Sequence, residues 1–480
     1  MLKIIELSSW KLLKKYSAEY LSSCKNSTNA SAILSHGDII LDYSAQYLNN
    51  EILNLLFQLA EECNLQQKIN DLFLGSPVNF TEQKPALHWA LRAGTNYKFS
   101  LDNCNVIEQV QNTLADMGAI ADQLRAQTWL GFSGKPITDI VNIGIGGSYL
   151  GSFFCLNAFS DVKLSSLNYH FISDFDPYSF SKVTINLNPE TTLFIVSSKS
   201  FTTLETVYNF KQAVDWLHQP HEALERHFIA VTAAAQKARE LGIHKILPIW
   251  DWVGGRYSLC SAINLITCIA IGFTAFKELL LGAASIDDHF RYAPFAQNLP
   301  VHLALIGIWN NNFLDIHQLL LLTYAQRLDH FTAYIQQLDM ESNGKNIDQY
   351  GRKVNYATGP IVWGGSGCQA QHSYYQLLCQ GTHNIAADLI SVDEYSDFAI
   401  YKLCVAQKTV LSTDFNQNHE LISGHNAINH IRLHSITPRS IGALIALYEH
   451  KIYVQSVIWQ INPFNQPGVE SSKRLMHVIK

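Results

Sequence analysis

This sequence has almost no net charge for its length. Lysine and arginine number 34 against 40 aspartates and glutamates, which leaves a formal net charge of only −6 on 480 residues. A dedicated nucleic-acid surface needs a stronger basic bias, so we expect no polyanion partner. Charged residues make up 15% of the chain and hydrophobic residues 48%, a composition that argues against disorder and for a buried interior.

Closely spaced cysteines are missing as well. Of the nine cysteines, the closest two are Cys260 and Cys268, so the sequence holds no Cys-x-x-Cys pair for zinc or redox chemistry. Reduced thiols in a cytosolic protein fit this spacing best. His221-Glu222 reaches its next histidine only at His227 and misses the helical zinc spacing, and we expect His430 and His434, which lie in an apolar-alternating stretch, to be structural. We therefore expect no metal site.

Neither a secretory signal nor a membrane span is evident. Residues 1–7 form an apolar run that Lys3 and Glu6 interrupt, and no small-residue cleavage site follows. Residues 257–276 carry no charge and approach the length of a span. They contain several Ser, Thr, Asn and Gly residues and directly follow a Gly-Gly-Arg loop, so we expect a core helix. A cytoplasmic protein that does not associate with a membrane is the expectation.

The length predicts two or three domains, at roughly 150 residues each. Short apolar runs alternate with helix-period segments, the pattern of a parallel sheet wrapped by helices. A first set of strands is predicted at 140–145, 169–172, 193–196, 228–231 and 246–249, and a second set at 319–322, 360–364 and 388–392. We expect an α/β protein with a mainly helical segment 1–108 that packs on the second domain, a first domain at 109–283 and a second at 284–480.

A glycine-rich loop follows the first predicted strand. Gly144, Gly146, Gly147 and Ser148 end the strand and open a helix, where free backbone N–H groups favour an anion. A plain tight turn explains the loop equally well. The dinucleotide fingerprint would need a third glycine where the chain has Tyr149, which disfavours a nicotinamide site.

A hydroxyl-rich loop follows the strand at 193–196. Ser198, Lys199, Ser200 and Thr203 surround the start of the next helix, where they could bind a phosphate monoester. The alternative is an N-cap beside a solvated lysine. We favour the phosphate site because both loops end strands of one sheet, where open α/β sheets place their ligands.

Four further side chains attract attention, each with an ordinary structural alternative. Arg256 follows Gly254-Gly255 and is either a fixed cation for an anionic ligand or half of a salt bridge. Glu341 ends a helix, where the dipole disfavours a carboxylate, so it is either a functional acid or base or simply exposed. His372 alone reads as a capping or core histidine and Lys473 as surface charge.

Taken together, these segments closely resemble the glucose-6-phosphate isomerase (phosphoglucose isomerase) family from about Asn79 to the C-terminus. The resemblance rests on segments in this order: 81–82 with 86–88, 143–148, 198–206, 251–258, 336–345, 360–364 with 371–372, 448–451 and 464–473. It implies two sugar-isomerase domains of flavodoxin-like topology, a homodimer, and reversible conversion of glucose 6-phosphate to fructose 6-phosphate in glycolysis and gluconeogenesis, with no cofactor.

The resemblance also implies roles for individual residues. Glu341 matches the family's catalytic base, Arg256 the arginine that steadies the intermediate, and His372 and Lys473 the pair associated with opening the sugar ring. The substrate-binding positions fall on Gly147, Ser148, Ser198, Lys199, Ser200, Thr203, Gly255 and Gln466. These residue types suit the chemistry, because one carboxylate can carry a proton between C2 and C1 while a guanidinium stabilises the enediolate.

The chain departs from the family most clearly at 364–372. Its sequence there is Gly-Gly-Ser-Gly-Cys-Gln-Ala-Gln-His, where the family has Gly-Glu-Pro-Gly-Thr-Asn-Gly-Gln-His. This difference motivates a rival hypothesis, a sugar-phosphate-binding regulator with little catalysis. A dinucleotide-dependent oxidoreductase is a third reading, but Asp161 precedes the strand that should end in its ribose contact, and Asp174 comes late.

Overall fold

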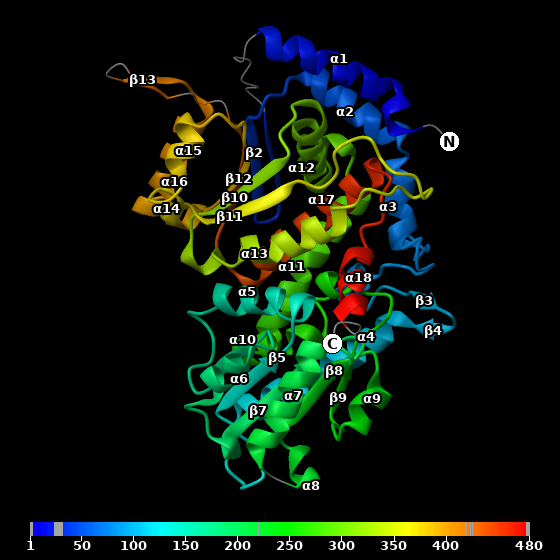
Figure 1. The fold of residues 1–480 in the computed structure, drawn as a ribbon, viewed down its shortest axis with the longest axis vertical. Coiled ribbons are helices and arrows are strands. Elements are labelled where there is room, and N and C mark those ends of the chain that lie inside the picture. Colours follow the sequence, from blue (N-terminus) through cyan, green and yellow to red (C-terminus); the bar gives the residue numbers. More distant parts are fainter. Residues whose placement is uncertain are drawn as a thin grey trace. The chain divides into compact units, whose positions relative to one another are not determined.

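The chain forms two compact units. The computed structural model describes residues 3–23, 32–218, 220–417, 420–422, 424 and 426–476 (Figure 1). Unit 1 comprises Met1–Ala86, Ser285–Ile436 and Ala443–Lys480, and unit 2 comprises Leu87–Ala284 and Thr437–Gly442. The division differs from the expected one at the first boundary, since residues 87–108 belong to unit 2. One contact there is the Leu87 N–H, which donates to the Trp252 carbonyl at 2.9 Å.

Unit 2 is built on a five-stranded parallel sheet in the order β6-β5-β7-β8-β9. Counted along the chain this is the order 2-1-3-4-5, the flavodoxin-like arrangement. The strands are β5 (Asp139–Ile143), β6 (Asn168–Ile172), β7 (Thr192–Ser197), β8 (Phe228–Thr232) and β9 (Ile246–Pro248), and a small hairpin pairs β3 (Ser100–Leu101) with β4 (Cys104–Asn105). All five predicted strands are confirmed.

Helices flank this sheet (Figure 1). They are α4 (Val106–Arg125), α5 (Leu150–Ala158), α6 (Pro177–Thr184), α7 (Leu204–Leu217), α8 (His221–Leu224), α9 (Ala235–Glu240), α10 (Leu265–Ile271) and α11 (Phe273–Tyr292), the last of which ends in unit 1. Strands β5, β7 and β8 are buried on both faces, which explains their continuous apolar runs. On one face Phe194 stacks on Phe228, and Phe210 of α7 meets Phe228 edge-on.

Unit 1 contains a six-stranded sheet in the order β1-β2-β15-β12-β10-β11. Strands β10 (Gln318–Thr323), β11 (Ile361–Ser366), β12 (Ala386–Val392) and β15 (Ala427–Leu433) are parallel, whereas the hairpin β1 (Ile33–His36) and β2 (Ile39–Ala45) joins β15 antiparallel. The four parallel strands repeat the order 2-1-3-4. A separate hairpin pairs β13 (Phe415–Gln417) with β14 (Glu420–Ile422).

Helices cover this sheet too, with α14, α15 and α16 packed on one face (Figure 1). The helices of unit 1 are α1 (Ser8–Ser23), α2 (Asn50–Glu62), α3 (Leu65–Phe73), α12 (Leu299–Ile308), α13 (Phe331–Ile335), α14 (Gly367–Ala370), α15 (Tyr375–Gln380), α16 (Ala399–Ser412), α17 (Pro438–Ile458) and α18 (Pro467–Met476). Most of α17 lies in unit 1, while its first turn belongs to unit 2. The predicted α/β class with two mainly parallel sheets is confirmed.

Two local expectations need correction. The first hundred residues are helical in α1–α3, but β1 and β2 also enter the sheet of unit 1, so this segment is part of that sheet as well as packing on it. Residues 257–276 form two short helical pieces and the start of α11 instead of one helix, because Gly272 breaks the run at a φ of 85°. In the described part of the chain, no helix has the length and hydropathy needed to cross a membrane.

Candidate active-site residues in the two units

In unit 2, two of the predicted loops begin at the same edge of the sheet. Strands β5 and β7 are parallel neighbours in which Ile143 pairs with Val196, so the loops after them start side by side. In an open sheet of this order, the ligand crevice lies at the carboxyl ends of these two strands, where the strand order reverses.

The first loop winds into a short 3₁₀ turn, Gly146–Ser148, ahead of α5. Gly146 has a φ of 57°, which glycine adopts without strain. A Cβ at Gly147 would lie 2.7 Å from the Arg256 backbone nitrogen and closer still to the Gly255 carbonyl. The loop therefore fits against 255–256 only with glycine at 147, and this contact brings Gly147 and Ser148 beside Arg256.

The second loop is organised by its own hydroxyl groups. Ser198 Oγ donates to Thr203 Oγ1 at 3.2 Å and accepts the Phe201 N–H at 3.2 Å. Ser200 Oγ lies 2.8 Å from Thr202 Oγ1 and accepts the Thr202 N–H. Helix α7 follows with Thr203 at its N-cap position. Hydroxyl and N–H donors at a helix start favour an anion.

Lys199 connects the second loop to a third loop, residues 251–258, which contains Arg256. Its Nζ donates to the carbonyls of Asp251 and Val253 at 3.0 Å each and lies 3.7 Å from the Asp251 carboxylate. The sequence did not reveal this anchoring, because nothing in the spacing relates 199 to 251. The ammonium thus joins the second loop to residues 251–253 and fixes the segment that leads to Arg256.

Arg256 is 4% exposed and sits on a single 3₁₀ turn, Gly255–Tyr257. Its guanidinium lies 5.7 Å from the centre of the Tyr257 ring, and Ser258 Oγ donates to the Gly255 carbonyl at 2.6 Å. Unit 2 therefore gathers eight of the predicted site residues, 147, 148, 198, 199, 200, 203, 255 and 256, around loops that contact one another.

In unit 1, Glu341 lies at the wall of a cavity of about 850 Å³. It ends a π-helical segment, Gln336–Glu341, that continues α13 with a wider turn. Gln337 Nε2 donates to Glu341 Oε2 at 3.2 Å, and Lys345 Nζ donates to the carbonyls of Glu341 and Ser342. A π-helical turn often marks a functional site, and the apolar spacing of an ordinary helix does not predict one.

Gln466 lines the same cavity, so the structure brings this predicted residue together with Glu341. Thr81 and Lys345 line it as well and were not singled out from the sequence. Thr81 Oγ1 accepts hydrogen bonds from Asn462 and Asn465, which join the chain before α18 to the first 86 residues. Both missed residues lie in segments that carry the family resemblance, and that was the signal available to find them.

His372 is exposed in the turn between α14 and α15, and its N–H donates to the Gln369 carbonyl at 3.0 Å. It is not among the described residues that line the Glu341 cavity. The backbone of Lys473 belongs to α18, but its side chain lies outside the described part of the structure. Within the described residues, no group of three or more His, Cys, Asp or Glu is placed to hold a metal ion.

Known proteins match this chain over nearly its whole length. A family model described as phosphoglucose isomerase matches residues 42–430 and 423–480. Glucose-6-phosphate isomerase of Legionella pneumophila (strain Lens) is 51% identical over 478 residues, which is 98% of this chain and 96% of the relative. The enzyme of the same name from Psychrobacter cryohalolentis is 41% identical over 506 residues, covering 97% of this chain and 91% of the relative.

The solved structures agree with the sequence comparisons. A crystal structure of a glucose-6-phosphate isomerase from Chlamydia trachomatis has a TM-score of 0.91 and 28% identity, and the match covers 99% of this chain and 96% of that one. The family model and the relatives point to one family, and the flavodoxin-like sheet orders agree with it. This chain belongs to the phosphoglucose isomerase family.

Proposed function

We propose that this chain catalyses the reversible conversion of glucose 6-phosphate to fructose 6-phosphate, the step shared by glycolysis and gluconeogenesis. Two of its relatives carry the name of that enzyme at 51% and 41% identity. The observation that carries the proposal in the structure is the Glu341 carboxylate, which lines a cavity large enough for a sugar phosphate.

Glu341 is the proposed base. Aldose–ketose isomerisation moves one proton from C2 to C1, and a single carboxylate within reach of both carbons can take and return it. The carboxylate is partly exposed to the cavity, and Gln337 and Lys345 hold the turn around it. Removal of the C2 proton leaves an enediolate, whose negative charge the permanently cationic Arg256 stabilises.

The loops of unit 2 are the proposed phosphate site. Ser148, Ser198, Ser200 and Thr203 supply hydroxyl donors, and Lys199 supplies a positive charge beside them. Gly147 allows the first loop to approach the backbone of Gly255 and Arg256 closely. The phosphate is remote from the reacting carbons, so these groups bind substrate and transition state alike and act mainly on KM.

The test of the base uses exchange in heavy water. Wild-type enzyme should incorporate deuterium at C2 of the substrate pool, while Glu341→Gln, which keeps the shape but cannot accept the proton, should lose roughly 10²- to 10⁴-fold in rate. Glu61→Gln, an exposed glutamate on α2, is the control and should behave like wild type. Exchange at the wild-type rate by Glu341→Gln would refute the assignment. If the wild-type protein bound the sugar phosphate without converting it, a sugar-phosphate-binding regulator would be favoured.

Ring opening requires a proton at the ring oxygen and removal of one from O1, and we assign these transfers to His372 and Lys473. We also propose a homodimer in which His372 serves the partner's site, because this side chain is exposed and lies outside the Glu341 cavity of its own unit. A cytoplasmic location fits the free thiols of the eight described cysteines.

Complementation tests the shared site. Glu341→Gln and His372→Ala dimers should each be inactive, whereas a mixed dimer should contain one site with both side chains intact. After dissociation and random exchange of equal amounts, about a quarter of wild-type activity should return. Exchange verified by mass with no recovery of activity would show that His372 serves its own subunit.

A further inference from the structure

A buried ion pair joins the π-helical segment that carries Glu341 to helix α17. Lys451 Nζ, on α17, donates to Asp339 Oδ2 at 2.8 Å, and the two side chains are 3% and 0% exposed. Asn343 Nδ2 donates to the other carboxylate oxygen at 3.2 Å. Asp339 is two residues before Glu341, so one turn of chain holds a core-facing carboxylate and a cavity-facing one.

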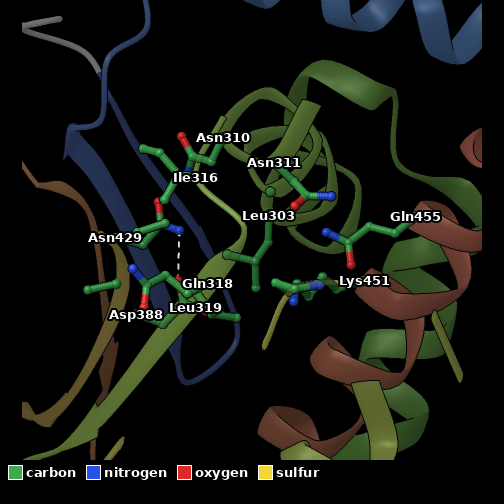
Figure 2. A pocket seen from close by; sticks show the side chains of 14 residues that line it. Leu303, Asn310, Asn311, Ile316, Gln318, Leu319, Asp388, Asn429, Lys451 and Gln455 are labelled. Carbon is green, nitrogen blue, oxygen red and sulfur yellow. Dashed lines mark hydrogen bonds between the residues drawn. The ribbon is translucent and has the colours of Figure 1, made fainter. Parts of the chain in front are cut away.

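The surroundings of Lys451 are polar but nearly closed to solvent. Figure 2 shows Lys451 and Gln455 on one side of a small cavity and Asp388 and Asn429 on the other. The cavity has a volume of about 20 Å³, room for one water molecule. Asp388 accepts from Asn429 Nδ2 and Tyr448 OH at 2.8 Å each. Burial raises the pKa of Asp388, and the Lys451 ammonium lowers it, with a net rise.

Stability alone does not account for such a pair. Removing two charges from water is unfavourable, and a buried ion pair can often be replaced by neutral residues of similar volume without loss of stability. What the pair adds is a single geometry, because Asp339 must face Lys451 for either charge to be satisfied. A π-helical turn needs such support, since its wide ring is less stable than the α-helical alternative.

We propose that Lys451 and Asp339 are positioning residues for the base: their ion pair holds the π-helical turn so that Glu341 faces the cavity. The inference rests on the proposed function, because the ion pair acts on the reaction only through the position of Glu341 as the base. Lys345 secures the other end of the same turn by donating to the Glu341 and Ser342 carbonyls. Without the ion pair the turn can rewind, and Glu341 shifts relative to the substrate.

The test separates positioning from stability with a neutral pair of similar volume. In Lys451→Met/Asp339→Asn both charges of the pair are absent and only Asp388 loses a nearby cation, so the melting temperature should recover relative to Lys451→Met alone. The kcat of the double variant should nevertheless stay about 10- to 100-fold below wild type, with KM changed less than about two-fold, because displacement of a catalytic group by about 1 Å can cost that much. C2 deuterium exchange should fall in parallel with kcat.

A neighbouring buried contact between His450 of α17 and Asp287 of α11 gives a matched control. His450 Nε2 lies 2.6 Å from Asp287 Oδ1, and both side chains are buried. Asp287→Asn should lower the melting temperature but leave kcat at the wild-type value. Wild-type kcat in the folded double variant, or an equal loss of kcat in Asp287→Asn, would overturn the inference. Glu341→Gln, measured alongside, distinguishes this failure from that of the proposed function, since an active Glu341→Gln enzyme would refute the base itself.

Discussion

At the scale of single residues, the structure explains why some predicted positions matter through contacts that no motif reveals. The sequence predicted an anion site at Gly147 from a strand–loop–helix pattern. It could not predict that the backbone of 255–256 lies against this glycine, because that contact joins segments more than a hundred residues apart. Nor could it predict that Lys199 donates to the carbonyls of 251 and 253, because these lie 52 and 54 residues further along the chain and no spacing relates them to the lysine.

A methyl group at 147 tests the loop contact. Gly147→Ala should push the first loop away from the Arg256 backbone and raise KM for the sugar phosphate by about ten-fold or more, since a small misplacement of a binding loop is costly. Steady-state kinetics measure the effect. Gly94→Ala is the control within unit 2, because a Cβ there meets no atom within 4 Å. Equal kinetics for the two variants would show that the loops do not need this contact.

At the scale of elements, the sequence pattern predicted the strands that have a continuous apolar run and missed the strands that lack one. Strands β7 and β12 are buried at every position, and their apolar runs stand out. Strand β2 alternates buried and partly buried residues at the sheet margin, and β15 includes Asn429, His430 and Arg432, so neither shows a continuous apolar run. The π-helical segment was missed because its apolar residues keep the spacing of an ordinary helix.

Removal of two hydroxyl groups tests the loop between β7 and α7. Ser200→Ala with Thr203→Ala removes two hydroxyl donors that contact the phosphate in our assignment, so KM should rise several-fold while kcat changes little. Initial-rate measurements over a range of substrate concentrations separate the two parameters. Ser181→Ala, an exposed hydroxyl on α6, should change neither. An unchanged KM in the double variant would move the phosphate elsewhere.

At the scale of the whole molecule, unit 1 buries histidines that resist protonation. Burial lowers the pKa of His302 and of His430 to about 4, and His289 is shifted to a similar value. Unfolded histidines titrate near pH 6.5, so between about pH 6.5 and 4 the unfolded chain binds protons that the native chain does not. Stability therefore falls as the pH falls through this window and is constant, for these groups, above it.

Each such histidine contributes a slope of up to about 1.4 kcal/mol per pH unit. His302→Leu, in a site bordered by the Tyr43 and Phe57 rings, should reduce the slope of unfolding free energy against pH by about that amount between pH 6.5 and 5. Denaturant titrations at several pH values measure it. The exposed His383 serves as control, and an equal change of slope in His383→Leu would show that burial is not the cause.

The antiparallel pairing of β2 with β15 has a consequence for how the chain is made. Leu41 pairs with Ile431, which lies 390 residues later in the chain, so the N-terminal hairpin leaves the ribosome long before its partner strand exists. The contiguous stretch 87–284 can complete its own parallel sheet in the meantime, whereas the six-stranded sheet must wait for the last strand. Until then the edge of β2 that faces away from β1 has no partner strand, and such an unpaired edge is prone to pair with other chains.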